Sequence, residues 1–330
     1  MSKARDLADL GAVTDRLDTV GASDGALSNR NLIINGAMQV AQRGTGPVSV
    51  ALYNYNTADR MRFSSSSGTS GTWTQEVVTD QDVGDFIGNA LKSSCSVAGS
   101  GGNEAGLNIR LELEDVEKYV GKKLTLSYYA KSDAAVTLTP VVFADLDITM
   151  GTDTLTTSYV RYTHTFTLPS LSTKTFFDLV MRVDGEVATS HYITGVQLEV
   201  GDTATPFEHR SYGDEVARCQ RYYQAFGRDF KGNIGISWVV GSRAGSNLLA
   251  FAIPLSCPLR ASPTVTAPAD NKINVRDGSG TDLNADYSSL SGYSNTSVNV
   301  NISTTLVPNS NAAAVLYMDT GYGFEFNAEL

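Results

Sequence analysis

Between Asn31 and Val200, apolar and polar residues alternate over short segments separated by Gly, Asp, Asn and Ser, and this period of two predicts β-strands. In "YVRYTHTFTL" one face carries Tyr159, Arg161, Thr163, Thr165 and Thr167, and the other carries Val160, Tyr162, His164, Phe166 and Leu168. Further strand candidates are "NLIINGAMQVAQ", "DRMRFSS", "GTWTQEVVT", "GLNIRLELE", "KKLTLSYYAKS", "AVTLTPVVFA", "FFDLVMRV" and "HYITGVQLEV". With one helical turn at "LEDVEKYV", this density of strands predicts an all-β fold, a jelly-roll-like β-sandwich over residues 31–205.

The pattern changes at "PFEHRSYGDEVARCQRYY", the stretch richest in residues that do chemistry. Its apolar residues recur at helical spacing and predict a short amphipathic connector helix over 206–226, starting at Ser211 or Gly213. These apolar residues are Val216, Cys219, Tyr222, Tyr223 and Phe226. Two interpretations are open: an active site, or helix-end charges and surface ion pairs. The second is favoured, because Asp214 and Glu215 fall in the first turn, where the helix dipole stabilises anions.

A second β unit is predicted over 227–330. Its strand candidates are "NIGISWVVG", "NLLAFAIPL", "SPTVTAP", "NKINVR", "SVNVNIS", "AAVLYMD" and "GFEFNAEL". Between two of them, "DGSGTDLNADYSSLSGYSNT" is rich in Ser, Gly, Asp and Asn and contains two tyrosines. This stretch is predicted to be a long loop, and loops of that length are commonly functional.

Residues 1–30 read differently from the rest. Leu10, Val13, Leu17 and Val20 are spaced three, four and three, which predicts a short N-terminal helix with a seam about two heptads long. So short a helix is marginal when isolated. It therefore predicts that copies of the chain associate there, or that the segment docks on a partner.

Composition excludes several classes of function. The chain of 330 residues has a formal net charge of −10, so a nucleic-acid partner is not expected. No apolar run approaches the roughly 20 residues of a membrane span, so no membrane insertion is expected either. The three cysteines are far apart and are predicted to be reduced and buried. A surface poor in charge and rich in Ser, Thr, Asn and Tyr suits neutral ligands such as glycans, and equally an ordinary all-β protein.

No catalytic or metal-binding pattern stands out. There is no GxSxG motif, and His164, His191 and His209 are dispersed, so no catalytic residue and no cofactor are predicted. His164 is predicted to be a satisfied core histidine. The spacing of Asp145, Asp147 and Asp153 in "ADLDITMGTD" loosely resembles a calcium loop, but the closing Glu is missing and no metal is predicted.

Five motifs in sequence order resemble bacteriophage tail-fibre and receptor-binding proteins. They are "NLIINGAMQVAQRGTG" with "YNTADRMRF", "LEDVEKYVGKKLTLSYYAKS", "ITGVQLEVGDTATPFEHRSYGDEVARCQRYYQAF", "FAIPLSCPLRASPTVT" and the terminal "NAEL". The resemblance implies a carbohydrate-binding-module-like sandwich, a joint and a C-terminal tip, usually in a homotrimer. Two features depart from it: only about thirty residues precede the sandwich, and Met61 replaces the usual tryptophan after Asp59-Arg60.

The sequence thus predicts a non-enzymatic phage virion fibre, made in the host cytoplasm, that binds a bacterial surface polysaccharide. Residues 1–30 are expected to bind other tail or adaptor proteins of the virion. The candidate glycan-binding residues are Asp286, Tyr287, Tyr293, Asn295, Trp238 and Tyr322. The candidate trimer-interface residues are Leu10, Val13, Leu17, Val20, Tyr222, Tyr223 and Phe226. For each tyrosine the alternative is core or interface packing. Two other functions stay open: a capsid-decorating or tail-connecting protein without glycan binding, and a polysaccharide depolymerase.

Overall fold

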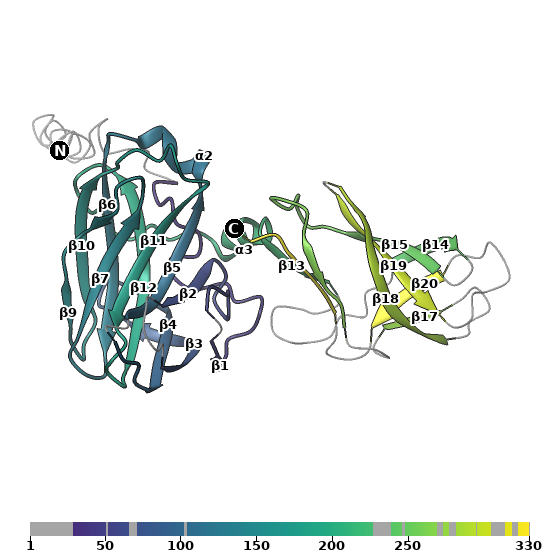
Figure 1. Cartoon of the computed structure of the whole chain (residues 1–330), viewed down its shortest axis with the longest axis horizontal. Coiled ribbons are helices and arrows are strands. Elements are labelled where there is room, and N and C mark those ends of the chain that lie inside the picture. The colour runs from purple at the N-terminus through teal and green to yellow at the C-terminus, as the bar shows by residue number, and fades with distance from the viewer. Residues whose placement is uncertain are drawn as a thin grey trace, which may run out of the picture. The chain divides into compact units, whose positions relative to one another are not determined.

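The computed structural model describes residues 29–50, 52–65, 71–101, 104–226, 239–245, 248–268, 273–276, 282–294, 296–304, 314–318 and 323–329. Within them the chain is mostly β-strand with short helices, which confirms the predicted all-β class (Figure 1). The described residues form two compact units. The first contains those up to Ala37 together with Phe63–Thr74 and Thr79–His209, and the second contains Met38–Arg62, Gln75–Val78 and those from Arg210 onward.

Two sheets stack face to face in a sandwich (Figure 1). Sheet A runs, in spatial order, β1 (Val48–Ser49), β3 (Thr72–Asp82), β4 (Ile87–Val97), β12 (Ser190–Val200), β6 (Lys123–Ser132) and β10 (Val160–Thr167). Sheet B runs β2 (Met61–Ser65), β5 (Glu104–Glu112), β11 (Phe176–Asp184), β7 (Val136–Phe143) and β8 (Ile148–Thr149), with β9 (Asp153–Leu155) also paired to β7. From β4 to β7 successive strands alternate between the sheets, as in a jelly roll. Leu126 of sheet A and Val142 and Leu179 of sheet B are fully buried in the core.

Two local predictions for the sandwich have different outcomes. The helical turn at "LEDVEKYV" is confirmed as α2 (Leu113–Val116) followed by the 3-10 turn η1 (Glu117–Tyr119). The strand predicted at "NLIINGAMQVAQ" is wrong. Asn35 and Met38 have φ of 61° and 54°, and such left-handed residues cannot continue a regular ladder. The segment instead follows β12 irregularly, with Leu32 N donating to Leu198 O at 2.9 Å.

The connector helix is shorter than predicted. Helix α3 spans Tyr212–Gln220, and the Oγ of its N-cap Ser211 accepts a hydrogen bond from Asp214 N, so the predicted start is confirmed. The chain then continues as strand β13 (Tyr223–Phe226), paired with β21 (Phe324–Asn327). The helical face predicted through Phe226 is therefore wrong, because aromatic residues that find a strand partner adopt extended backbone.

The second unit contains a small sheet and a closed barrel (Figure 1). The sheet has the order β13, β21, β16 (Thr264–Thr266). The barrel has the order β14 (Val239–Gly245), β15 (Leu248–Pro254), β19 (Ser297–Thr304), β18 (Asp282–Tyr293), β17 (Ile273–Arg276) and β20 (Ala314–Met318). Strand β19 alternates as a half-buried strand should: Val298, Val300 and Ile302 are fully buried, and the residues between them are not.

The long loop predicted between "NKINVR" and "SVNVNIS" is largely a strand. Strand β18 occupies Asp282–Tyr293 and pairs with both β17 and β19. Its register with β19 shifts at Tyr287/Ser289 and again at Leu290/Gly292. These irregularities explain why its residues lack a clean period of two.

Two general predictions can also be compared with the described residues. Cys95 and Cys219 are buried free thiols, as predicted, whereas Cys257 is only half-buried. No helix in the described part of the chain is both long enough and apolar enough to cross a membrane.

Candidate functional site

A row of aromatic and basic side chains crosses the outer face of sheet A. Tyr192 of β12 pairs with Lys92 of β4 on one side and with Lys131 of β6 on the other. Tyr159 directly precedes β10, whose Val160 pairs with Ala130, so it stands beside Lys131. Because Ala130 is buried in the sandwich, its neighbour Lys131 points outward. We call Lys92, Lys131, Tyr159 and Tyr192 the tyrosine–lysine platform. All four side chains are half-buried.

The ammonium group of Lys131 lies between the two tyrosine rings. Its Nζ is 4.7 Å from the ring centroid of Tyr159 and 4.6 Å from that of Tyr192. On the other side of Tyr192, Lys92 Nζ is 5.9 Å from the same centroid. Cations at these distances are attracted by the electron-rich ring face. The platform is therefore an ordered surface of alternating rings and ammonium groups.

Polar groups border the platform at both ends. Tyr159 Oη donates to Gln81 Oε1 at 3.3 Å, and Tyr192 Oη approaches Asp133 Oδ2 at 3.5 Å. Burial raises the pKa of the Tyr159 phenol above its usual value, so that hydroxyl remains a neutral donor at physiological pH. Apolar ring surface bordered by hydroxyl, amide, carboxylate and ammonium groups is chemistry that suits a polar ring such as a sugar.

An aromatic cluster covers the outer face of sheet A around Tyr129, next to the platform. At the turn between β3 and β4, Phe86 packs edge-on against Tyr129 of β6 at 5.6 Å between centroids and stacks on Phe207 at 5.3 Å. The hydroxyl of Tyr129 donates to Asp85. Gly195 (φ +58°) lies below this cluster, and a Cβ there would stand 2.7 Å from the Tyr129 ring, so only glycine fits.

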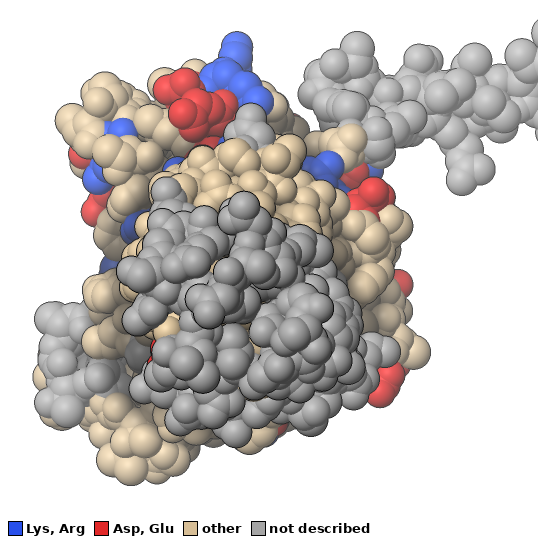
Figure 2. All heavy atoms as spheres, turned by 90° about the vertical axis from the view of Figure 1, so that its right-hand side faces the viewer, with Lys and Arg blue, Asp and Glu red and all other residues tan. Residues whose placement is uncertain are grey.

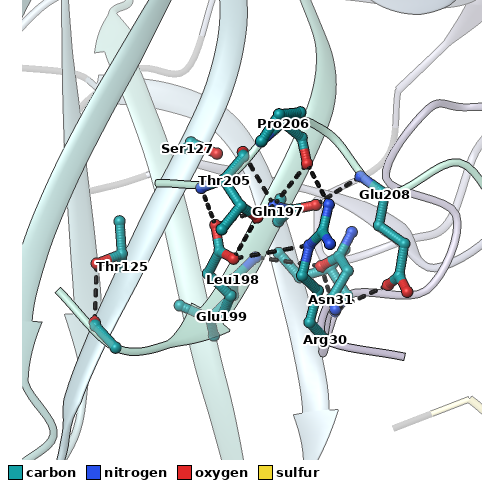
Figure 3. Close-up of polar contacts among 12 residues, drawn as sticks. Arg30, Asn31, Thr125, Ser127, Gln197, Leu198, Glu199, Thr205, Pro206 and Glu208 are labelled. Atoms are coloured by element: carbon teal, nitrogen blue, oxygen red, sulfur yellow. Dashed lines mark hydrogen bonds and ion pairs between the residues drawn. The ribbon is translucent and has the colours of Figure 1, made fainter. Parts of the chain in front are cut away.

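A buried polar network holds residues 205–208, which follow β12, against sheet A (Figure 3). The Glu199 carboxylate accepts hydrogen bonds from Thr205 N at 2.9 Å and from Thr205 Oγ1 at 2.6 Å. Gln197 Nε2 donates to Glu199 Oε1 at 2.9 Å, and Gln197 Oε1 accepts from Glu208 N at 2.8 Å. The Glu208 carboxylate in turn accepts from Asn31 N at 2.9 Å. Because these oxygens are occupied by the chain itself, the network fixes the segment in place.

The acids and the histidine of "PFEHRSYGDEV" therefore have structural partners. His209 packs edge-on against Phe86 at 4.8 Å, and Glu215 Oε1 lies 3.1 Å from Arg210 Nη1. Asp214 lies in the first turn of α3, next to its cap. These contacts match the interpretation as helix-end charges and ion pairs.

Three of the six predicted glycan-binding residues lie in the described part of the chain. Asp286 is exposed on β18, whereas Tyr287 and Tyr293 pack partly buried against the barrel core. Tyr287 lies edge-on to Phe324 at 5.9 Å, and Tyr293 Oη donates to Leu259 O at 2.7 Å. These two tyrosines therefore pack against the core, which is the alternative to glycan binding predicted for each tyrosine. Three other candidates, Asn295, Trp238 and Tyr322, lie outside the described residues.

The predicted trimer-interface tyrosines are covered within their own chain. Tyr222 and Tyr223 are each 2% exposed, and Phe226 packs against the core of the second unit. The two tyrosines present almost no surface to another copy, because an arginine covers each of their rings. The N-terminal candidates Leu10, Val13, Leu17 and Val20 lie outside the described residues.

Those arginines belong to the second unit and form what we call the arginine–tyrosine cluster: Arg43, Arg60, Tyr222, Tyr223 and Glu329. The guanidinium carbon of Arg60 is 3.6 Å from the Tyr222 ring centroid, and that of Arg43 is 3.8 Å from the Tyr223 centroid. The Glu329 carboxylate forms ion pairs with both arginines, at 3.3 Å for Arg43. The cluster joins four segments that are separate in the sequence, "VAQRG", "ADRMRF", "CQRYY" and "NAEL".

Other candidate groups are also engaged by the chain. Each ring nitrogen of His164 faces an oxygen, Met150 O at 2.8 Å and Asp153 Oδ2 at 2.7 Å, so neither is available to a substrate. Hydrogen bonds from Ser170, Ser172 and Thr173 hold the pKa of Asp145 well below its usual range. Among the described residues no cluster of His, Cys, Asp and Glu is arranged to hold a metal ion.

Sequence reasoning placed Tyr159 and Arg161 on one strand face but missed the platform as a site. The signal available was an outward Tyr or Lys on three of the candidate strands, because Lys92 lies on β4, for which no strand was predicted. Assembling them requires the register of four segments, which no single strand pattern contains.

No protein-family model matches this chain, and no curated protein matches it. Among solved structures, the CBM22-1 xylan-binding domain of Xyn10C from Paenibacillus barcinonensis has 12% identity and a TM-score of 0.33, covering 49% of this chain and 99% of that one. TmCBM61 in complex with β-1,4-galactotriose has 11% identity and a TM-score of 0.33, covering 52% and 100%. The enzymatically active domain of tailspike protein 4 of bacteriophage CBA120 has 15% identity and a TM-score of 0.35, covering 52% and 22%. At these scores the likenesses carry no argument about what this chain binds.

Proposed function

We propose that this chain is a non-enzymatic glycan-binding protein and that the tyrosine–lysine platform is its binding surface. The observation that carries the proposal is the outward row in which Lys131 lies within 5 Å of two half-buried tyrosine rings. Sugar rings present an apolar face and a rim of hydroxyls, which the rings and the bordering Gln81, Asp133 and lysine groups can contact together.

The biological setting of the proposal is adsorption of a bacteriophage to its bacterial host. The five tail-fibre-like motifs of the sequence support this setting, with the chain as a homotrimeric virion fibre attached through residues 1–30. Three copies per fibre raise the effective affinity of a weak site by about 10²–10⁴ when they can engage together. A weak, open platform is therefore sufficient for adsorption.

The first test measures binding of the full chain to an array of bacterial surface oligosaccharides and to host cells. Tyr192→Ala and Tyr159→Ala should each weaken binding on the order of tenfold, because they remove stacking surface at the centre of the contact. Tyr119→Ala is the matched control. Tyr119 is also half-buried with a lysine, Lys118, 5.4 Å from its ring centroid, but it lies on η1, outside the platform.

Two results would contradict the proposal. One is wild-type protein that binds no glycan and does not compete with phage for host cells at saturating concentration. The other is glycan binding that both platform variants retain at full strength. Release of new reducing ends from the polysaccharide would instead support the depolymerase alternative.

A further inference from the structure

The charge of the platform differs from that of the whole chain. The sequence has 35 Asp and Glu against 25 Lys and Arg. On the side of the molecule that Figure 2 shows, the Lys, Arg, Asp and Glu of the described residues form small groups, with uncharged described residues between them. The platform, in contrast, contains two lysines in a single row across β4, β12 and β6.

Lys131 has no carboxylate partner among the described residues of the chain. Its contacts there are the two tyrosine rings, at 4.6 and 4.7 Å, and none of the ion pairs between described residues includes it. A ring face attracts a cation but does not neutralise it. A half-buried ammonium in this position is therefore poised to receive an anionic group.

A second cation lies on the same strand face. Arg161 is two residues after Tyr159, and its Nη2 donates to Ser127 Oγ at 3.1 Å and to the carbonyl oxygen of Thr205. Its Nε is buried without a hydrogen-bond partner, and in the described part of the chain its guanidinium has no carboxylate. Arg161 thus adds positive charge beside the platform that the surrounding chain does not cancel.

The nearby carboxylates do not remove this excess. Asp85 accepts a hydrogen bond from the hydroxyl of Tyr129, and Asp133 Oδ2 lies 3.5 Å from the hydroxyl of Tyr192. Neither carboxylate forms an ion pair with Lys131 or Arg161 in the described part of the chain. Charge complementarity therefore favours a negatively charged ligand over a neutral one.

We infer that the platform recognises an acidic glycan, with a carboxylate of a sugar ring bound to Lys131 while the ring lies against Tyr159 or Tyr192. This inference rests on the proposed function and specifies its ligand class. A carboxylate receives a charge-assisted hydrogen bond from an ammonium, which is shorter and stronger than a bond to a neutral group. The same interaction is screened by salt, whereas ring stacking is not.

The experiment uses an array of neutral and acidic bacterial oligosaccharides in which each carboxylated glycan is also present after carboxyl reduction. Wild-type protein should bind the carboxylated forms on the order of tenfold better than their reduced forms. The preference should shrink when the ionic strength is raised from about 0.05 M to about 0.5 M. Lys131→Gln should abolish the preference, Lys131→Arg should retain it, and Lys118→Gln, on an exposed lysine outside the platform, should leave it unchanged.

The outcomes separate this inference from the proposed function. If neutral and carboxyl-reduced glycans bind as well as carboxylated ones and Tyr192→Ala weakens them all, the platform binds glycans but the acidic class is wrong. If the preference for carboxylated forms survives Lys131→Gln in a folded variant, Lys131 is not the recognising group and the inference also fails. If no glycan binds, the proposed function fails first.

Discussion

The tyrosine–lysine platform and the arginine–tyrosine cluster use the same interaction in opposite settings. Both place cations over tyrosine rings, at 4.6–4.7 Å for Lys131 and at 3.6–3.8 Å for the two arginines. In the cluster, Arg60 is 1% exposed, the Glu329 carboxylate pairs with both arginines, and Asp59 also pairs with Arg43. On the platform the residues are half-buried and Lys131 has no such partner among the described residues. Both regions contain cation–π contacts, so that contact does not distinguish them. The cluster is a packing element because it is buried and has a counter-ion, and the platform can bind a ligand because it is only half-buried and its Lys131 has no counter-ion among the described residues.

Arginine also suits the buried setting for its shape. Its planar guanidinium stacks on an aromatic ring and still presents edge hydrogens to a carboxylate, whereas the ammonium of lysine is compact and strongly hydrated. The cluster therefore satisfies both groups at once, and lysine is found where water can reach. Burial raises the pKa of Asp59, which lies 3.5 Å from Arg43, to about 6, so even the acids of this region are affected by the loss of water.

The largest expected effect comes from removing the counter-ion of the cluster. Glu329→Ala removes the carboxylate that pairs with buried Arg60 and with half-buried Arg43, and breaking a buried pair such as that of Arg60 costs about 3–5 kcal/mol. The free energy of unfolding measured in urea should fall by that amount. Glu117→Ala, which removes an exposed carboxylate, is the control and should change it little. Equal effects of the two substitutions would show that Glu329 is not a structural counter-ion.

A second test asks whether a cation can be buried beside a ring with no counter-ion at all. His191 is 1% exposed, packs edge-on against Trp73 with 5.7 Å between ring centroids, and has no hydrogen-bond partner on either ring nitrogen among the described residues. Burial lowers its pKa to about 4, against 6.5 when unfolded, so the folded chain keeps it neutral while the unfolded chain takes up a proton. Stability is therefore lost as pH falls from 6.5 to 4, by roughly 3 kcal/mol.

The measurement for His191 is the pH dependence of unfolding in wild type and in His191→Leu. Leucine fills a similar volume and leaves no unsatisfied polar group, so the variant should lose less stability on the acid side. Taking the difference between the two proteins cancels the contributions that they share, including the titration of Asp59. Parallel curves from pH 7 to pH 4 would mean that His191 accepts its proton without penalty.

The smallest expected effect is on the platform itself. Lys131→Met should change the free energy of unfolding by no more than about 0.5 kcal/mol, because the side chain is partly solvated and makes no ion pair among the described residues. Thermal unfolding of the variant beside wild type measures this. A loss of several kcal/mol would place Lys131 with the buried arginines as a packing element and would remove the main contrast between the two regions.

Much of the architecture was predictable because it depends on local patterns. Period-two alternation predicted most strands of both units, and the cap at Ser211 predicted where α3 begins. The failed predictions share a cause, which is that contacts with distant segments, and not the local pattern, decided the backbone. Residues 31–42 have the composition of a strand, but Asn35 and Met38 take left-handed backbone. Strand β18 has the composition of a loop, yet it is completed by β17 and β19.

The candidate site shows the same division. By itself the sequence determined which residues alternate outward on each strand, including Tyr159, and that the chain carries too few basic residues for nucleic acid. Only the tertiary structure decided that Tyr192 lies between two lysines and that Tyr222 is buried beneath Arg60. The physical reason is that side-chain direction is set by local backbone geometry, whereas strand register and burial are set by pairing between segments far apart in the chain.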